Sequence, residues 1–151
     1  MSELHVEVER RIGAPAERVY RCIADCREHH PKFLPPAFSD FRVEEGGVGA
    51  GTVFSFKLTA GGRTRAARMR VEEPEPGRVL TESDLGSSLV TTWTVTPENA
   101  ASRVHVATRW QGAGGVGGFF ERLFAPRALS RLYTDELERL DRYVRNLPPI
   151  G

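Results

Sequence analysis

The sequence predicts an α+β fold in which a curled antiparallel sheet of six or seven strands wraps around one long C-terminal helix. The first observation is the stretch 119–147, whose large apolar residues recur from Leu129 onward at steps of three and four, the period of one helix face. The second is a series of runs in which apolar and polar residues alternate, as in half-buried strands. Only about two to seven residues connect these runs, too few for the crossovers that parallel neighbours need. We therefore expect an antiparallel meander.

The chain begins with a predicted strand and a predicted short helix. Residues 4–12 alternate between apolar and polar side chains, which indicates a half-buried strand. Pro15 suits the first position of a helix, and the apolar residues between Ala16 and Cys26 fall at helical spacing. The segment 34–38 that follows is apolar but too rich in proline to be regular.

The middle of the chain holds the remaining predicted strands, and glycine or proline marks the turns between them. Two-residue alternation or β-branched residues predict strands at 38–45, 51–60, 63–73, 78–84, 89–96 and 104–111. The glycine-rich run 112–118 leads into the closing helix. Pro126 predicts either a kink or a break in that helix.

The width of the sheet predicts its shape. Seven strands spaced about 4.8 Å apart make a sheet about 30 Å wide, whereas a helix with its side chains is only about 10–12 Å across. The sheet must curl to cover its apolar face, and the curl leaves a gap where helix and sheet diverge. A gap lined by large apolar side chains suits a small apolar ligand.

The composition excludes several classes of protein. Of the 151 residues, 21 are basic and 20 are acidic, and a net charge of +1 gives no reason to expect nucleic acid or a membrane surface as a partner. We see no signal peptide and no stretch that could span a bilayer, so we expect no membrane insertion. Cys22 and Cys26 are four residues apart on a predicted helix, which favours free thiols. We expect one domain over 1–151, cytoplasmic, and either a monomer or a homodimer.

Several segments resemble the START-like (SRPBCC) superfamily, and most closely its polyketide cyclase/dehydrase and lipid transport group. The segments that carry the resemblance are 14–20, 33–35, 49–52, 92–95 and the long terminal helix. The resemblance covers nearly the whole chain and implies the helix-grip fold. It also implies an internal cavity for hydrophobic ligands, with family members ranging from lipid and hormone binders to aromatase/cyclases. It supplies no catalytic signature that transfers residue by residue.

Two other patterns invite functional interpretations that we consider weaker. Gly112, Gly114 and Gly117 match the spacing of a dinucleotide-binding turn, but the chain ends with the helix and lacks the second strand of that motif. Residues 22, 26, 29 and 30 are two cysteines and two histidines that could share a helix face and bind zinc. We favour buried structural thiols and a pair of histidines at a helix end. No cofactor and no metal are expected.

The candidate ligand-binding residues are the large apolar or ionisable side chains expected to face the hollow. If Leu80 faces inward, Glu82 faces inward with it, and Arg10 and Arg65 share faces with inward residues. Glu82 with either arginine could form a structural ion pair, a ligand-orienting pair or an acid/base pair. The full set comprises Phe54, Phe56, Met69, Trp93, Trp110, Glu82, Arg10, Arg65, Phe120 and Phe124. No catalytic residue can be assigned from the sequence.

The leading hypothesis is therefore binding of a small hydrophobic molecule, a lipid, polyketide or isoprenoid-like compound, between the terminal helix and the sheet. The first alternative is a cyclase or dehydratase on the same scaffold, which needs at least two ionisable side chains in the hollow. The second is a protein-interaction module that docks through the apolar segments 33–38 and 119–120.

Overall fold

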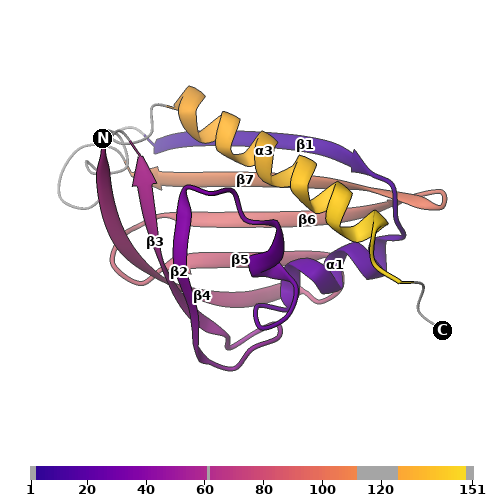
Figure 1. The fold of residues 1–151 in the computed structure, drawn as a ribbon, viewed down its shortest axis with the longest axis horizontal. Coiled ribbons are helices and arrows are strands. Elements are labelled where there is room, and N and C mark those ends of the chain that lie inside the picture. The colour runs from indigo at the N-terminus through magenta and orange to yellow at the C-terminus, as the bar shows by residue number, and fades with distance from the viewer. Residues whose placement is uncertain (1–2, 61, 112–125, 149–151) are drawn as a thin grey trace.

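A computed structural model describes residues 3–60, 62–111 and 126–148 (Figure 1). The elements in chain order are β1 Glu3–Ile12, α1 Ala16–Ala24, the short 3-10 helix η1 His30–Phe33, β2 Phe38–Glu45, β3 Val53–Ala60, β4 Arg63–Glu75, β5 Val79–Asp84, β6 Val90–Glu98, β7 Ala101–Gln111 and α3 Pro126–Arg145. Among these residues, no helix combines the length and the apolar character that a membrane span requires.

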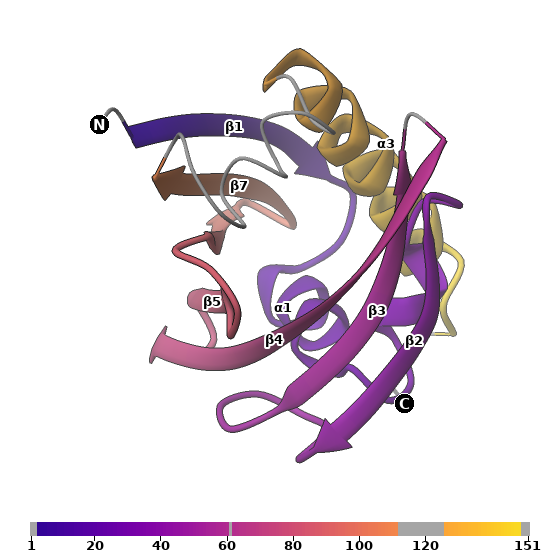
Figure 2. The ribbon, with the colours of Figure 1, turned by 90° about the vertical axis from the view of Figure 1, so that its left-hand side faces the viewer.

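The strands form one antiparallel sheet, as predicted. Its strand order is β1-β7-β6-β5-β4-β3-β2, so the first strand lies at one edge beside the last, and β2 forms the other edge. Figure 2 shows the sheet curling strongly, with β2, β3 and β4 bending round so that α3 lies across the concave side. Register shifts within β2 and in β4 between Glu72 and Glu75 contribute to this bend, because a bulge kinks the strand that carries it.

The predicted helix stripe is the face of α3 that packs on the sheet. Leu137 and Leu140 are fully buried and Val144 is 1% exposed, while Arg131 and Arg142 on the opposite side are exposed. Figure 1 shows α3 crossing the sheet over β1 and β7. The described part of the helix begins at Pro126, so the predicted kink or break at that proline lies outside the described residues.

Several strand boundaries differ from the sequence prediction by one to three residues; β7, for example, begins at Ala101 instead of at residue 104. β3 begins at Val53 instead of at residue 51, because Gly51 and Gly49 have positive φ angles of 89° and 71° and belong to the preceding turn. β4 continues through Pro74 to Glu75, because Pro74 falls in the bulge, where no ladder hydrogen bond is required of it.

The glycine-rich turn 46–51 attaches the end of α1 to the sheet and so fixes where η1 starts. The backbone N–H of Gly49 donates to the carbonyl of Ala24 at 3.0 Å, and the N–H of Cys26 donates to the carbonyl of Gly47 at 2.8 Å. Gly49 has a φ of 71°, which favours glycine, and a Cβ atom there would also lie 2.3 Å from Glu73 Oε1. This attachment places His30 against the interior.

The two cysteines do not form a zinc site with the neighbouring histidines. Both thiols are free and buried in the core, as favoured from the sequence. His29 and His30 diverge: the His29 ring bonds to the hydroxyl of Tyr143, and the His30 ring enters the interior. In the part of the chain that the structure describes, the one group of closely spaced potential metal ligands is Asp25, Glu28 and His29, which includes neither cysteine.

Candidate functional site

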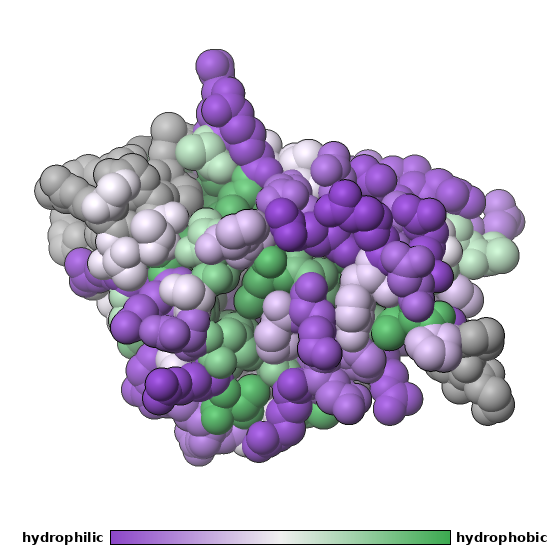
Figure 3. All heavy atoms as spheres, in the orientation of Figure 1, coloured by the Kyte–Doolittle hydropathy of each residue, from purple (hydrophilic) through white to green (hydrophobic). Residues whose placement is uncertain are grey.

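A pocket of about 70 Å³ lies between α3, η1 and the curled half of the sheet. Figure 3 shows apolar residues gathered in the hollowed middle of this face. The aromatic side chains of the lining are Phe38, Phe41, Phe54, Phe56, Trp93 and Tyr133. Leucines, Ala67 and Met69 complete the apolar wall, and four polar residues interrupt it: His30, Glu82, Thr91 and Glu136.

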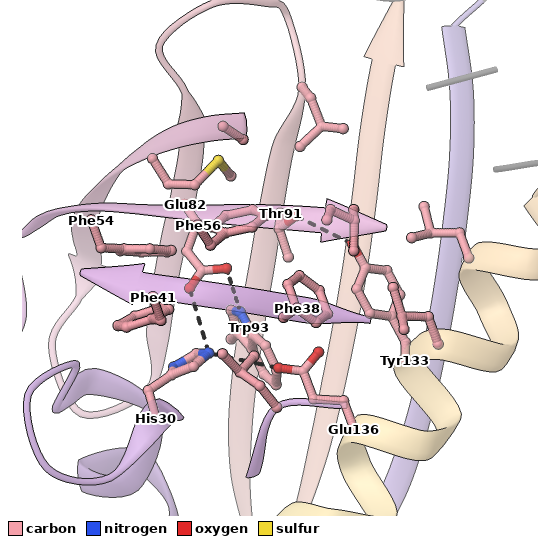
Figure 4. Close-up of a pocket in the computed structure, with 17 residues that line it drawn as sticks. His30, Phe38, Phe41, Phe54, Phe56, Glu82, Thr91, Trp93, Tyr133 and Glu136 are labelled. Atoms are coloured by element: carbon pink, nitrogen blue, oxygen red, sulfur yellow. Dashed lines mark hydrogen bonds and ion pairs between the residues drawn. The ribbon is translucent and has the colours of Figure 1, made fainter. Parts of the chain in front are cut away.

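His30 lies at the centre of the polar part of the pocket and is 3% exposed (Figure 4). Its Nδ1 lies 2.7 Å from the carbonyl oxygen of Ile23 and therefore carries a proton, because a carbonyl only accepts. Its Nε2 faces two carboxylates, 3.6 Å from Glu136 Oε2 and 4.0 Å from Glu82 Oε2. The ring is therefore held by the backbone on one side and directed at the two acids on the other.

Glu82 reaches the pocket from β5 and Glu136 reaches it from α3, so the cluster joins sheet, helix and η1 (Figure 4). The two residues are 7% and 3% exposed. The indole N–H of Trp93 donates to Glu82 Oε1 at 3.1 Å. Buried carboxylates need a cation or hydrogen-bond donors, and His30 is the residue placed to supply the charge.

The surroundings shift the pKa values of this cluster. Burial alone would lower the pKa of His30, but Glu136 and Glu82 outweigh it and raise the pKa to about 8. Burial raises the pKa of Glu82, and the nearby His30 and the Trp93 N–H only partly oppose that increase. His30 is thus mostly protonated at neutral pH, which places a proton donor inside an apolar pocket.

A second group of hydroxyls closes the other side of the pocket. The Tyr133 hydroxyl bonds to Thr108, Thr91 lies 3.4 Å from the same hydroxyl, and the two threonine hydroxyls are 2.7 Å apart. Burial raises the pKa of Tyr133, so its hydroxyl stays protonated at physiological pH. These hydroxyls satisfy one another inside the protein.

The aromatic rings form a continuous wall from His30 outward. The His30 and Phe41 rings are nearly parallel, with centroids 6.3 Å apart, and Phe41 stacks on Phe54 at 5.0 Å. Phe54 in turn stacks on Phe56 at 6.0 Å. Such a wall presents flat apolar faces to anything bound in the pocket.

The structure brings half of the sequence-predicted residues together in the lining: Phe54, Phe56, Met69, Glu82 and Trp93. Trp110 is buried but lies outside the lining. Phe120 and Phe124 lie outside the described residues.

Neither predicted arginine reaches the pocket. Arg10 points inward at the far edge of the sheet, where its guanidinium lies 3.3 Å from Asp141 on α3. Arg65 is exposed on β4. Pairing of Glu82 with either arginine was therefore a wrong expectation, because His30 occupies the position next to the carboxylate.

The segment 33–38, considered above as a docking surface, instead contributes to the interior. Phe33 is 1% exposed, and Leu34 and Phe38 line the pocket.

The family model for polyketide cyclase/dehydrase and lipid transport proteins matches residues 3–145. The chain belongs to this family. The solution structure of KanY protein is similar at 38% identity and a TM-score of 0.84, over 97% of this chain and 100% of that one. No functionally curated protein sequence matches the chain.

Two enzymes share the helix-grip fold of this polyketide cyclase/dehydrase family member. One is the Zhui aromatase/cyclase from Streptomyces sp. R1128, at 18% identity and a TM-score of 0.75, over 95% of this chain and 94% of that one. The other is norcoclaurine synthase from Thalictrum flavum in complex with dopamine and hydroxybenzaldehyde, at 16% identity and a TM-score of 0.73, over 99% of this chain and 90% of that one.

The residue pattern did not place His30 and Glu136 in the pocket of this family member, although it placed Glu82 there. The sequence predicts His30 at a helix end, because Pro31 interrupts the helical pattern; in the structure the short helix η1 carries its side chain inward. Glu136 had a detectable signal, since it lies three residues after Tyr133 and four before Leu140, on the apolar stripe itself. An acid within an apolar stripe indicates a buried partner.

Proposed function

We propose that this family member binds a small hydrophobic molecule, a lipid, polyketide or isoprenoid-like compound, in the pocket between α3 and the sheet. The observation that carries the proposal is the partly open pocket of about 70 Å³ walled by aromatic and aliphatic side chains. A well-packed domain has few voids larger than a water molecule. Binding of an apolar ligand in a pocket of this kind is favourable, because it removes apolar surface of both the ligand and the pocket from water.

The size of the pocket implies that side chains move when a ligand enters. An engineered apolar cavity of about 150 Å³ holds one benzene ring, so the 70 Å³ seen here must expand even for a single ring. The large half-buried side chains of the lining are those with space to move: Leu34, Phe38, Phe41, Phe56 and Leu132. We expect the fully buried Trp93 and the His30 cluster to stay in place.

Filling the pocket from its wall tests this proposal. Ala67 lines the pocket, whereas Ala66, next to it on β4, is exposed and lies outside the lining. We expect Ala67→Leu to weaken binding of p-xylene by about tenfold or more, because a ligand would then overpack the site. Ala66→Leu is the matched control and should bind like the parent in a protein-observed NMR titration. Equal weakening by both variants, or no saturable binding by the parent, would contradict the proposal.

A second candidate function is a dehydratase or cyclase, and the ionisable cluster favours it. The enzyme hypothesis required at least two ionisable side chains in the hollow, and His30, Glu82 and Glu136 all line it. For a β-hydroxy ketone, His30 Nε2 would give its proton to the leaving hydroxyl as the C–O bond breaks, releasing water. Glu82 would take the proton from the carbon beside the carbonyl as the double bond forms. Proton transfer from Glu82 back to His30, 4.0 Å away, would restore both groups.

A pH–rate profile with a benzylic β-hydroxy ketone tests this candidate through the absorbance of the conjugated product. Activity of the parent should fall as pH rises through about 8, because the acid His30 is then deprotonated. In Glu136→Gln this limb should move to lower pH by about one unit or more, because a carboxylate that favours the imidazolium is gone. Turnover with an unmoved limb would argue against His30 as the acid.

A further inference from the structure

One oxygen in the pocket lacks a hydrogen-bond partner. Glu82 Oε2 is buried and accepts no hydrogen bond, although the other oxygen of the same carboxylate accepts from Trp93. Among the described residues that line the pocket, it is the one buried side-chain nitrogen or oxygen left in this state. The nearest cation, His30 Nε2, lies 4.0 Å away, beyond hydrogen-bond distance.

The other polar groups of the lining already have partners. The hydroxyls of Thr91 and Tyr133 are hydrogen-bonded within the cluster of hydroxyls on the far side of the pocket. His30 Nδ1 is bonded to the backbone, and Glu136 is paired with His30 Nε2 at 3.6 Å. Leaving a buried acceptor unmet is costly, particularly one on a charged group. Figure 4 shows the Glu82 carboxylate between the Phe54 and Trp93 rings, with one oxygen directed at the Trp93 indole and the other toward the His30 ring.

We propose that Glu82 Oε2 accepts a hydrogen bond from a neutral hydroxyl of the bound ligand. The pocket then selects aromatic hydroxyl compounds over hydrocarbons and ethers of the same size. This inference rests on the proposed binding function and names the class of ligand that the pocket takes.

Burial in an apolar pocket, next to the charged His30 ring, favours a neutral donor over a cationic one. His30 already places a cation next to both carboxylates. An ammonium group on the ligand would meet that charge and would also lose its hydration on entering an apolar site. A hydroxyl satisfies the oxygen without adding charge, and a flat ring matches the stacked faces of Phe41, Phe54 and Phe56.

Four ligands built on one ring separate these possibilities: p-cresol, p-methylanisole, p-xylene and p-methylbenzylamine. Titrations of the full chain near neutral pH should show p-cresol binding about tenfold or more tightly than p-xylene and p-methylanisole, the gain typical of a hydrogen bond to a charged acceptor. The amine should bind more weakly than p-cresol. Equal affinity for p-cresol and p-xylene would overturn this inference and leave the binding function standing. Failure of all four to bind would overturn both.

The variant Glu82→Gln tests whether Glu82 is the residue that causes the preference for p-cresol. With the amide oxygen kept on the Trp93 N–H, the amide nitrogen faces the ligand as a donor, so the variant should lose the preference for p-cresol and favour p-methylanisole. Glu136→Gln is the matched control, because it alters the other carboxylate of the cluster. It should keep the preference of the parent. Loss of the preference in Glu136→Gln but not in Glu82→Gln would overturn the assignment.

Discussion

Replacing His30 with glutamine is expected to lower the free energy of unfolding by about 3–5 kcal/mol, the loss typical of removing one partner from a buried ion pair. Glu82 and Glu136 would remain 7% and 3% exposed with no cation beside them. Glutamine can still donate to the carbonyl of Ile23, so the change removes mainly the charge. Urea denaturation at neutral pH measures the effect.

The dependence of stability on pH tests the same pair without a variant. The pKa of His30 is raised from 6.5 to about 8 on folding, so its stabilisation is complete below about pH 6.5 and is lost as pH rises through 8. A shift of that size corresponds to about 2 kcal/mol. Burial also raises the pKa of Glu82, and a raised pKa again means stability lost with rising pH. The parent should therefore become less stable between about pH 6 and about pH 9.

His29 provides the control for this prediction. It is the same residue type one position earlier, is half-buried, and bonds to the hydroxyl of Tyr143 at 2.7 Å. Asp25 and Glu28 lie near its ring, but Glu28 is exposed to solvent, which weakens any ion pair there. His29→Gln should cost about 1 kcal/mol, the usual worth of one hydrogen bond. If His30→Gln cost no more than His29→Gln, and the parent showed no loss of stability above pH 7, the buried ion cluster would not carry the stability assigned to it.

The fold could be predicted because the period at which apolar residues recur distinguishes strands from helices in this sequence. Two-residue alternation, together with the β-branched residues of 89–96, located the strands, and the short connections predicted their antiparallel order. The inward position of Glu82 followed from the same alternation, since it lies two residues after the buried Leu80. The mismatch in width between one helix and seven strands predicted the hollow, and the structure retains an unfilled pocket there.

The partners of the charged side chains could not be predicted, because they depend on contacts between distant parts of the chain. Arg10 shares the inward alternation of β1, yet it lies under the last turns of α3 and pairs with Asp141 instead of reaching the pocket. His30 meets Glu82 and Glu136 only because the sheet curls and the turn 46–51 anchors α1. The spacing of residues along the sequence carries no information about either of these long-range contacts.

Replacing Leu137 on α3 with alanine is expected to lower the free energy of unfolding by about 2–5 kcal/mol, the range for a fully buried leucine changed to alanine. Leu137 is fully buried in the core, and its loss leaves a cavity that rigid neighbours on a sheet and a helix close only in part. Thermal and urea unfolding of Leu137→Ala measure the loss.

Leu132→Ala separates the two tasks of the same helix face. Leu132 is half-buried and lines the pocket, so its removal forfeits less buried area, and we expect a cost of about 1 kcal/mol. The same change enlarges the pocket, and binding of p-xylene should strengthen or stay unchanged, whereas Leu137→Ala should leave it unaltered as long as the protein is folded. Equal stability losses for the two variants, with no difference in ligand binding, would mean that the helix packs uniformly on the sheet. If α3 instead diverges from the sheet at one end, Leu132→Ala should cost less stability than Leu137→Ala, and any change in ligand binding should come from Leu132→Ala, because Leu132 borders the pocket and Leu137 does not.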